Sequence, residues 1–195
     1  MDPYATPADL ILDAALEQAG KVGWEAVHLH QLAEQLGLTL ADIHRAYPTK
    51  DALAEAWFDR AEAALLAIAH TPGWPALPVP ERLCRAICAW LDALAPHRET
   101  TRAMLRYKLQ PEHLHLQALG AVRVSRTVQC ICEVARLSDT GWRRELAEAA
   151  LTTLYLATLS HWLYDESPGA QRTRERLRRG LALLGRAAGP LGFGR

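Results

Sequence analysis

The stretch LAEQLGLTLADIHRAYPTK, residues 32–50, decides the fold of this chain. Apolar residues recur at helical spacing up to Leu36, and Gly37 is the residue type that commonly follows the end of a helix. Thr39, two residues later, is a favoured N-cap for the next helix. The pattern therefore predicts two short helices joined by a tight turn, which is the arrangement of a helix-turn-helix. The second helix of such a unit has the dimensions to enter the major groove of DNA.

Helical signals continue on both sides of this stretch. Upstream, residues 6–23 predict a first helix with Thr6 as N-cap and Asp9 in the capping-box position. Downstream, Pro48 ends the second short helix and Thr49 begins a long one. More helices are expected near residues 80–95, 99–109, 112–136, 140–164 and 167–188. The chain should thus be all-α, with about nine helices. We expect a helix-turn-helix domain over residues 1–50 and a helical body over residues 51–195.

Charge is distributed unevenly along the chain. Residues 1–60 hold four Lys and Arg against ten Asp and Glu, a balance of −6, and the remainder has the opposite balance, so the formal net charge is zero. DNA affinity depends on neutralised phosphates, so an acidic head binds a duplex only if its few cations share one face. The candidates for that face are Lys21, Arg45 and Lys50, joined by His28, His30 and His44 when protonated. Because His28 and His30 are two residues apart, we expect their side chains to point to different sides of a helix.

Several classes of protein are not indicated by the sequence. It has no apolar run near the roughly 20 residues that a spanning helix needs, and no secretory signal, so we expect a cytoplasmic protein. It has no Gly-rich phosphate loop, nucleophile elbow or metal-spaced His/Cys cluster. We therefore expect no enzymatic activity, no catalytic residues, no metal and no cofactor. The four cysteines are expected to be reduced and mostly buried.

A family resemblance is carried by the segment ILDAALE…GWEAVHLHQLAEQLGLTLADIHRAYPTKDAL, within residues 9–60. This segment resembles the N-terminal domain of TetR-type transcriptional repressors. The resemblance implies a homodimer whose head binds double-stranded operator DNA. It also implies a C-terminal body that encloses a small-ligand pocket and supplies the dimer interface. The function implied is that of a ligand-responsive transcriptional regulator.

The same resemblance implies a set of DNA-binding residues, namely Thr39, Leu40, His44, Arg45, Tyr47 and Lys50. Thr39 would cap the recognition helix and touch phosphate, and Lys50 would bind phosphate from the start of the following helix. The sequence also departs from the family pattern. Leu40 replaces a polar or basic residue, and Asp42 stands where a small hydroxyl is common.

An apolar cavity among the C-terminal helices is a further expectation, since pockets between bundle helices are common. A hydrophobic small molecule or lipid is the ligand that such a lining suits. The candidate lining residues are Trp90, Met104, Tyr107, Leu151, Leu154, Tyr155, Leu159 and Trp162.

A second resemblance supports an alternative function. Gly23-Trp24 and the motif Trp162-x-x-Asp165-x-Ser167-Pro168 are similar to a lipid-binding family of ubiquinone biosynthesis that shares the TetR fold. The last helix is basic and amphipathic, with Leu177, Leu181 and Leu184 at helical spacing, and such helices lie on anionic membranes. The alternative is thus a lipid- or quinone-binding accessory protein that contacts a membrane through its last helix and binds no DNA. A negative surface on the second short helix and at the start of the next, together with an apolar stripe turned outward, would favour this alternative. A positive surface there, with paired heads about 34 Å apart, would favour the regulator.

Overall fold

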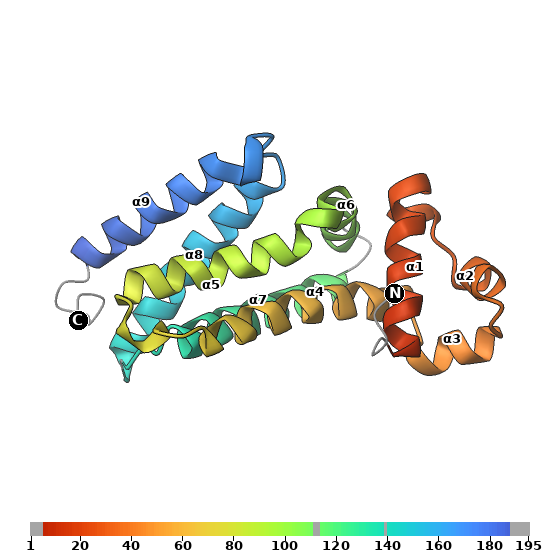
Figure 1. Ribbon diagram of the computed structural model, residues 1–195, viewed down its shortest axis with the longest axis horizontal. Coiled ribbons are helices and arrows are strands. Elements are labelled where there is room, and N and C mark those ends of the chain that lie inside the picture. The colour runs from red at the N-terminus through yellow and green to blue at the C-terminus, as the bar shows by residue number, and fades with distance from the viewer. Residues whose placement is uncertain (1–5, 111–113, 139, 188–195) are drawn as a thin grey trace. The chain divides into compact units, whose positions relative to one another are not determined.

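The computed structural model describes residues 6–110, 114–138 and 140–187, which are almost entirely helical (Figure 1). The expected all-α class is confirmed. The expected helix start at 112 and helix end at 188 lie outside the described residues.

The helices are α1 (Pro7–Val22), α2 (Leu29–Leu36), α3 (Leu40–Ala46), α4 (Lys50–Ala67), α5 (Val79–Leu94), α6 (Arg98–Lys108), α7 (Leu114–Val134), α8 (Trp142–Trp162) and α9 (Gln171–Ala187). Short 3₁₀ turns include η1 (Trp24–Ala26), η2 (Ile68–His70) and η6 (Pro168–Ala170).

The chain folds into two compact units. The first comprises Met1–Arg60 and Leu94–Leu116, and the second comprises Ala61–Ala93 and Gln117–Arg195. Helix α4 begins in the first unit and ends in the second, while α6 belongs to the first. The functional boundary after residue 50 stays a prediction.

The first unit is built around α1, which packs against α2, α3 and α6. Its apolar face buries Ile11 and Leu16, while Leu32 from α2 and Ile43 from α3 are fully buried in the same unit. The predicted cap of α1 is present, because Thr6 Oγ1 accepts a hydrogen bond from the Asp9 amide at 3.2 Å. Burial of these side chains is the main stabilisation of so short a helix as α3.

Two polar contacts join α6 to α4 within the first unit. Trp57 Nε1 donates a hydrogen bond of 2.8 Å to Thr101 Oγ1 in the interior. Lys108, only 6% exposed, forms ion pairs with Asp51 at 2.8 Å and with Glu55. Because an ammonium group is costly to bury alone, the two carboxylates are what allow Lys108 to lie at this position.

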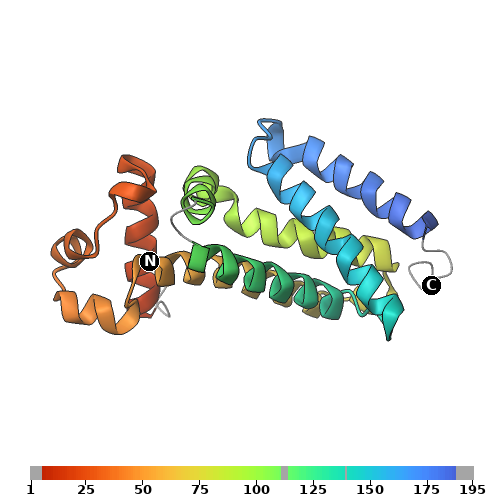
Figure 2. The ribbon, with the colours of Figure 1, turned by 180° about the vertical axis from the view of Figure 1, so that it is seen from behind.

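In the second unit α9 packs along α8 (Figure 2). Leu177 and Leu181, two members of the apolar stripe of α9, are buried, and Leu184 is half-buried. A methyl group on Gly180 would overlap the Leu154 side chain, so this glycine permits the close approach of the two helices. The apolar stripe of the last helix thus faces the body of the unit.

The junction between α8 and α9 is organised by Asp165, which is 4% exposed. Its carboxylate accepts hydrogen bonds from the backbone amides of Ser167 and Thr173, at 2.9 and 2.8 Å, and from both of their hydroxyl groups. Ser167 Oγ in turn accepts from the Arg172 amide at 3.1 Å. The Asp165-x-Ser167-Pro168 part of the motif therefore caps the first turn of α9.

Within the part of the chain that the structure describes, none of the helices has the length and hydropathy to cross a membrane.

Candidate nucleic-acid interface

The recognition helix α3 begins with a reciprocal capping box. Thr39 Oγ1 accepts a hydrogen bond from the Asp42 amide at 3.2 Å, and the Asp42 carboxylate accepts from the Thr39 amide at 3.1 Å. The Thr39 hydroxyl also donates to this carboxylate at 2.5 Å. These hydrogen bonds, with a further one from Arg45, lower the pKa of Asp42 to about 2. The acid that departs from the family pattern thus caps the helix.

The turn before α3 depends on Gly37. Its backbone is left-handed, with φ 65° and ψ 27°, a region that side chains with a Cβ disfavour. The amide of Leu38 donates to the Ala33 carbonyl at 2.9 Å, which closes the end of α2. The chain then reverses into α3, and the contact between α2 and α3 completes the helix-turn-helix (Figure 1).

One side of α3 is open to solvent. We call Leu40, Ala41, His44 and Arg45 the reading surface, because all four are exposed and lie on the outer side of the helix. Leu40 is 53% exposed. Arg45 has 76% of its side chain exposed and pairs with Asp42 at 2.8 Å. Three of the predicted DNA-binding residues therefore lie on this surface, namely Leu40, His44 and Arg45.

Two other predicted DNA-binding residues are engaged inside the first unit. Tyr47 is 8% exposed, and its hydroxyl donates to the Ala8 carbonyl at 3.1 Å. Lys50 Nζ donates to the Glu25 carbonyl at 2.9 Å and lies 5.1 Å from the centre of the Trp24 ring. Partial burial lowers the pKa of Lys50 below its usual value. Phosphate contact by Lys50 stays a prediction, and it would require the side chain to leave the Glu25 carbonyl.

A groove of about 530 Å³ lies beside the reading surface. We call it the histidine groove. Its lining residues are His28, Leu29, His30, Leu40, Ala41 and His44.

The histidine groove corrects one expectation. The rings of His28 and His30 do not point to different sides but stack, with centroids 5.5 Å apart. The physical reason is that α2 begins at Leu29, so His28 is its N-cap and has extended backbone, with φ −123° and ψ 135°. Helical spacing therefore does not apply to this pair, and the expectation was wrong because it placed both histidines inside a helix.

The predicted ligand-pocket residues are divided between the two units. Met104 and Tyr107 lie on α6 in the first unit, and the other six lie in the second. Five of those six are buried, and the sixth, Leu154, is half-buried. The rings of Trp90 and Tyr155 meet edge to face at 5.5 Å. The buried residues are Trp90, Leu151, Tyr155, Leu159 and Trp162.

A second groove, of about 320 Å³, lies between α7 and α8 in the second unit. Its lining is mostly apolar, with Ser125, Glu148 and Thr152 as polar residues. Glu148 also forms an ion pair with Arg144 at 2.7 Å. The lining residues are Ala121, Val124, Ser125, Val128, Glu148, Thr152 and Leu156.

Comparison with known proteins agrees with this geometry. Residues 11–57 match the family model for bacterial regulatory proteins of the tetR family, and this range contains α2 and α3 entirely. The search of curated proteins gave no significant match.

Among solved structures, the chain is similar to a TetR transcriptional regulator from Nitrosomonas europaea, with 41% identity and a TM-score of 0.81. The match covers 90% of this chain and 96% of that one. A TetR transcriptional regulator from Rhodococcus sp. RHA1 shares the fold at 17% identity, with a TM-score of 0.67 and coverage of 90% and 93%. A tetR-family regulator from Streptomyces coelicolor does so at 18% identity, with a TM-score of 0.65 and coverage of 94% and 82%. The chain has the helix-turn-helix, matches the family model and is similar to the Nitrosomonas regulator over most of its length. The chain therefore belongs to the TetR family of bacterial regulatory proteins.

Proposed function

We propose that the protein is a ligand-responsive transcriptional regulator that binds operator DNA as a homodimer. The observation that carries this proposal is the reading surface. A capped helix of a helix-turn-helix presents Leu40, His44 and Arg45 to solvent, while Ile43 on its opposite side is fully buried. A short helix anchored on one side and exposed on the other can enter a major groove without unfolding the head.

The membrane alternative is less well supported. A helix that lies on a bilayer must present its apolar stripe outward, but Leu177 and Leu181 are buried against the body of the second unit. The Trp162-to-Pro168 motif also has a structural role, since Trp162 is buried and Asp165 caps α9. Helix packing thus accounts for two of the features that suggested a lipid-binding accessory protein, the amphipathic last helix and the Trp162-to-Pro168 motif.

For the ligand, we propose a hydrophobic small molecule that binds in the second unit. The groove between α7 and α8 supports this, because it is open and mostly apolar, with one carboxylate and two hydroxyl groups to orient a guest. The buried residues around Trp90 and Tyr155 offer a second location, which a ligand would reach only by displacing packed side chains.

A selection from genomic DNA tests the proposal. Sheared genomic fragments are incubated with the full chain, and bound fragments are recovered and sequenced, while vesicle flotation is run on the same preparation. We expect a small set of fragments that share an inverted repeat, with half-sites spaced by about one or two helical turns. Flotation with vesicles and no recovered DNA would instead favour the accessory protein.

Two matched capping boxes allow the role of α3 to be separated from general stability. Thr39→Ala and Thr6→Ala each remove one N-cap hydroxyl, and each should lower the free energy of unfolding by about 1 kcal/mol. Only Thr39→Ala should weaken binding to a selected duplex, because only it frays the recognition helix. Urea unfolding and fluorescence anisotropy measure the two effects. Equal losses of DNA affinity in both variants would contradict a specific role for α3.

A further inference from the structure

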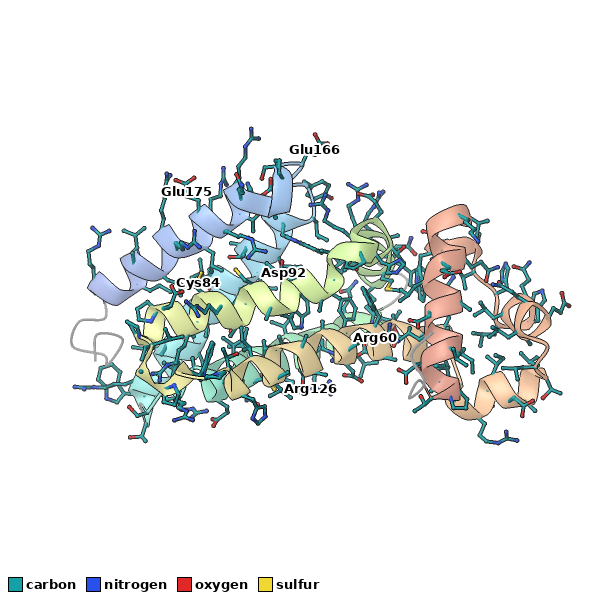
Figure 3. All side chains as sticks on the ribbon, in the orientation of Figure 1. Arg60, Cys84, Asp92, Arg126, Glu166 and Glu175 are labelled. Atoms are coloured by element: carbon teal, nitrogen blue, oxygen red, sulfur yellow. The ribbon has the colours of Figure 1, made fainter. Side chains whose placement is uncertain are left out.

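Most of the Lys and Arg side chains of residues 1–60, which we call the head, form contacts within the head. Arg45 pairs with Asp42, and Arg60 pairs with Asp13 at 2.5 Å (Arg60 is labelled in Figure 3). Lys50 donates to a backbone carbonyl and lies over an aromatic ring, as described above. These are three of the four Lys and Arg residues among residues 1–60, a segment with a formal balance of −6. Arg45 is largely exposed and can still turn to a phosphate, but few other fixed cations of the head can, so another source of positive charge would strengthen phosphate neutralisation.

The histidine groove can supply that charge. His28, His30 and His44 are all exposed and line one groove, and His44 belongs to the reading surface itself. Histidine is the side chain whose charge ordinarily changes between about pH 5 and pH 8. Full protonation would change the formal balance of residues 1–60 from −6 to −3, with all three added charges in the histidine groove.

We propose that His28, His30 and His44 are phosphate-contacting residues and that DNA binding by this protein is coupled to their protonation. This inference rests on the proposed DNA-binding function. A duplex phosphate stabilises the imidazolium form, so the complex takes up protons, and affinity rises as the pH falls. The protein would then hold its operator more tightly in a mildly acidic cell than in an alkaline one.

Charged groups on the surrounding elements do not share this pH response. Carboxyl side chains ordinarily titrate near pH 4, and Lys and Arg above about pH 10, so between about pH 6 and pH 8 histidine is the type that changes. Asp42 in particular stays ionised, because its capping hydrogen bonds hold its pKa at about 2. The charged residues on the neighbouring elements are Asp9, Asp13, Glu17 and Lys21 on α1, Glu25 on η1, Glu34 on α2, Asp42 and Arg45 on α3, and Lys50, Asp51, Glu55, Asp59, Arg60 and Glu62 on α4.

The test measures affinity for a fluorescein-labelled mixed-sequence duplex of roughly 30 base pairs, at about 50 mM salt and at several pH values between about 6 and 8. The variant is the triple substitution His28→Gln, His30→Gln and His44→Gln. The control is His70→Gln, an exposed histidine in η2 of the second unit. Circular dichroism at each pH confirms that every form stays folded. Calorimetry in two buffers of different ionisation enthalpy counts the protons taken up.

We expect the wild type and the His70→Gln control to bind at least about tenfold more tightly at pH 6 than at pH 8, with net proton uptake. The triple variant should change by less than about threefold and take up fewer protons. If the wild type binds DNA equally at both pH values, or the triple variant keeps the full pH response, the inference is overturned while the proposed function stands. If the wild type binds neither this duplex nor any genomic fragment at any pH, both are overturned.

Discussion

Replacing Asp165 by alanine is expected to lower the free energy of unfolding by about 3 kcal/mol. The Asp165 carboxylate accepts two backbone and two hydroxyl hydrogen bonds at a position that is 4% exposed. Hydrogen bonds to a charged group contribute about 1.5–3 kcal/mol, and the amides left behind at the start of α9 would be buried without their acceptor. Urea unfolding followed by circular dichroism measures the loss.

A neighbouring residue provides the control for this prediction. Glu166 is exposed on the outside of the same junction (Figure 3), and Glu166→Ala should change stability by no more than about 0.5 kcal/mol. Equal effects of the two substitutions would show that the hydrogen-bond network around Asp165 is not what holds α9 in place.

The Asp165 network also predicts a pH dependence of stability. Burial tends to raise the pKa of this carboxyl, but the hydrogen bonds from Ser167 and Thr173 outweigh it and hold the pKa well below its usual value. The stabilisation is therefore complete above the ordinary aspartate pKa of about 3.9 and is lost as the pH falls through that value toward the folded pKa. Asp165→Asn should flatten the slope of stability against pH below about pH 5. An unchanged slope would contradict this assignment.

Replacing Lys108 by alanine should destabilise the first unit by about 3 kcal/mol. The substitution removes the cation between Asp51 and Glu55, so two partly buried carboxylates on α4 are left to repel each other. Breaking a buried ion pair by deleting one partner typically costs about 3–5 kcal/mol, and we take the lower end because the carboxylates are 22% and 29% exposed.

The control for Lys108 is Arg85→Ala, which removes an exposed i,i+4 ion pair with Glu81 on α5. Its effect should be below about 1 kcal/mol. Thermal or urea unfolding of the two variants under the same conditions gives the comparison. A Lys108→Ala protein as stable as the wild type would mean that the α4–α6 contact does not depend on this charge.

The features that sequence predicted well are those encoded by local patterns. The N-caps Thr6 and Thr39 and the helix end at Gly37 involve residues within a few positions of one another, so their chemistry can be identified without knowing the fold. The all-α class follows from helical periodicity in the same way. The head of the protein could thus be predicted nearly element by element.

Sequence reasoning was weaker wherever a residue's partner is distant or a helix boundary matters. It did not predict that Lys50 bonds to the Glu25 carbonyl, because those residues are 25 positions apart. It separated His28 from His30 because it placed both inside a helix, whereas α2 begins at Leu29. It also could not distinguish a membrane motif from a helix cap at Asp165, since one of the groups that Asp165 binds, Thr173, lies beyond the motif. For Lys50 and Asp165 the missing information is a contact with a more distant residue, and for the two histidines it is a helix boundary.

We expect the reading surface of α3 to contact DNA, and the proposed function depends on this contact. The most direct measurement is the affinity of the Arg45→Glu variant for a duplex selected by the wild type. Arg45 is largely exposed, so the substitution should leave the fold intact. We expect at least about a thirtyfold loss of affinity and a shallower dependence on salt concentration. An affinity and salt dependence equal to those of the wild type would contradict this expectation.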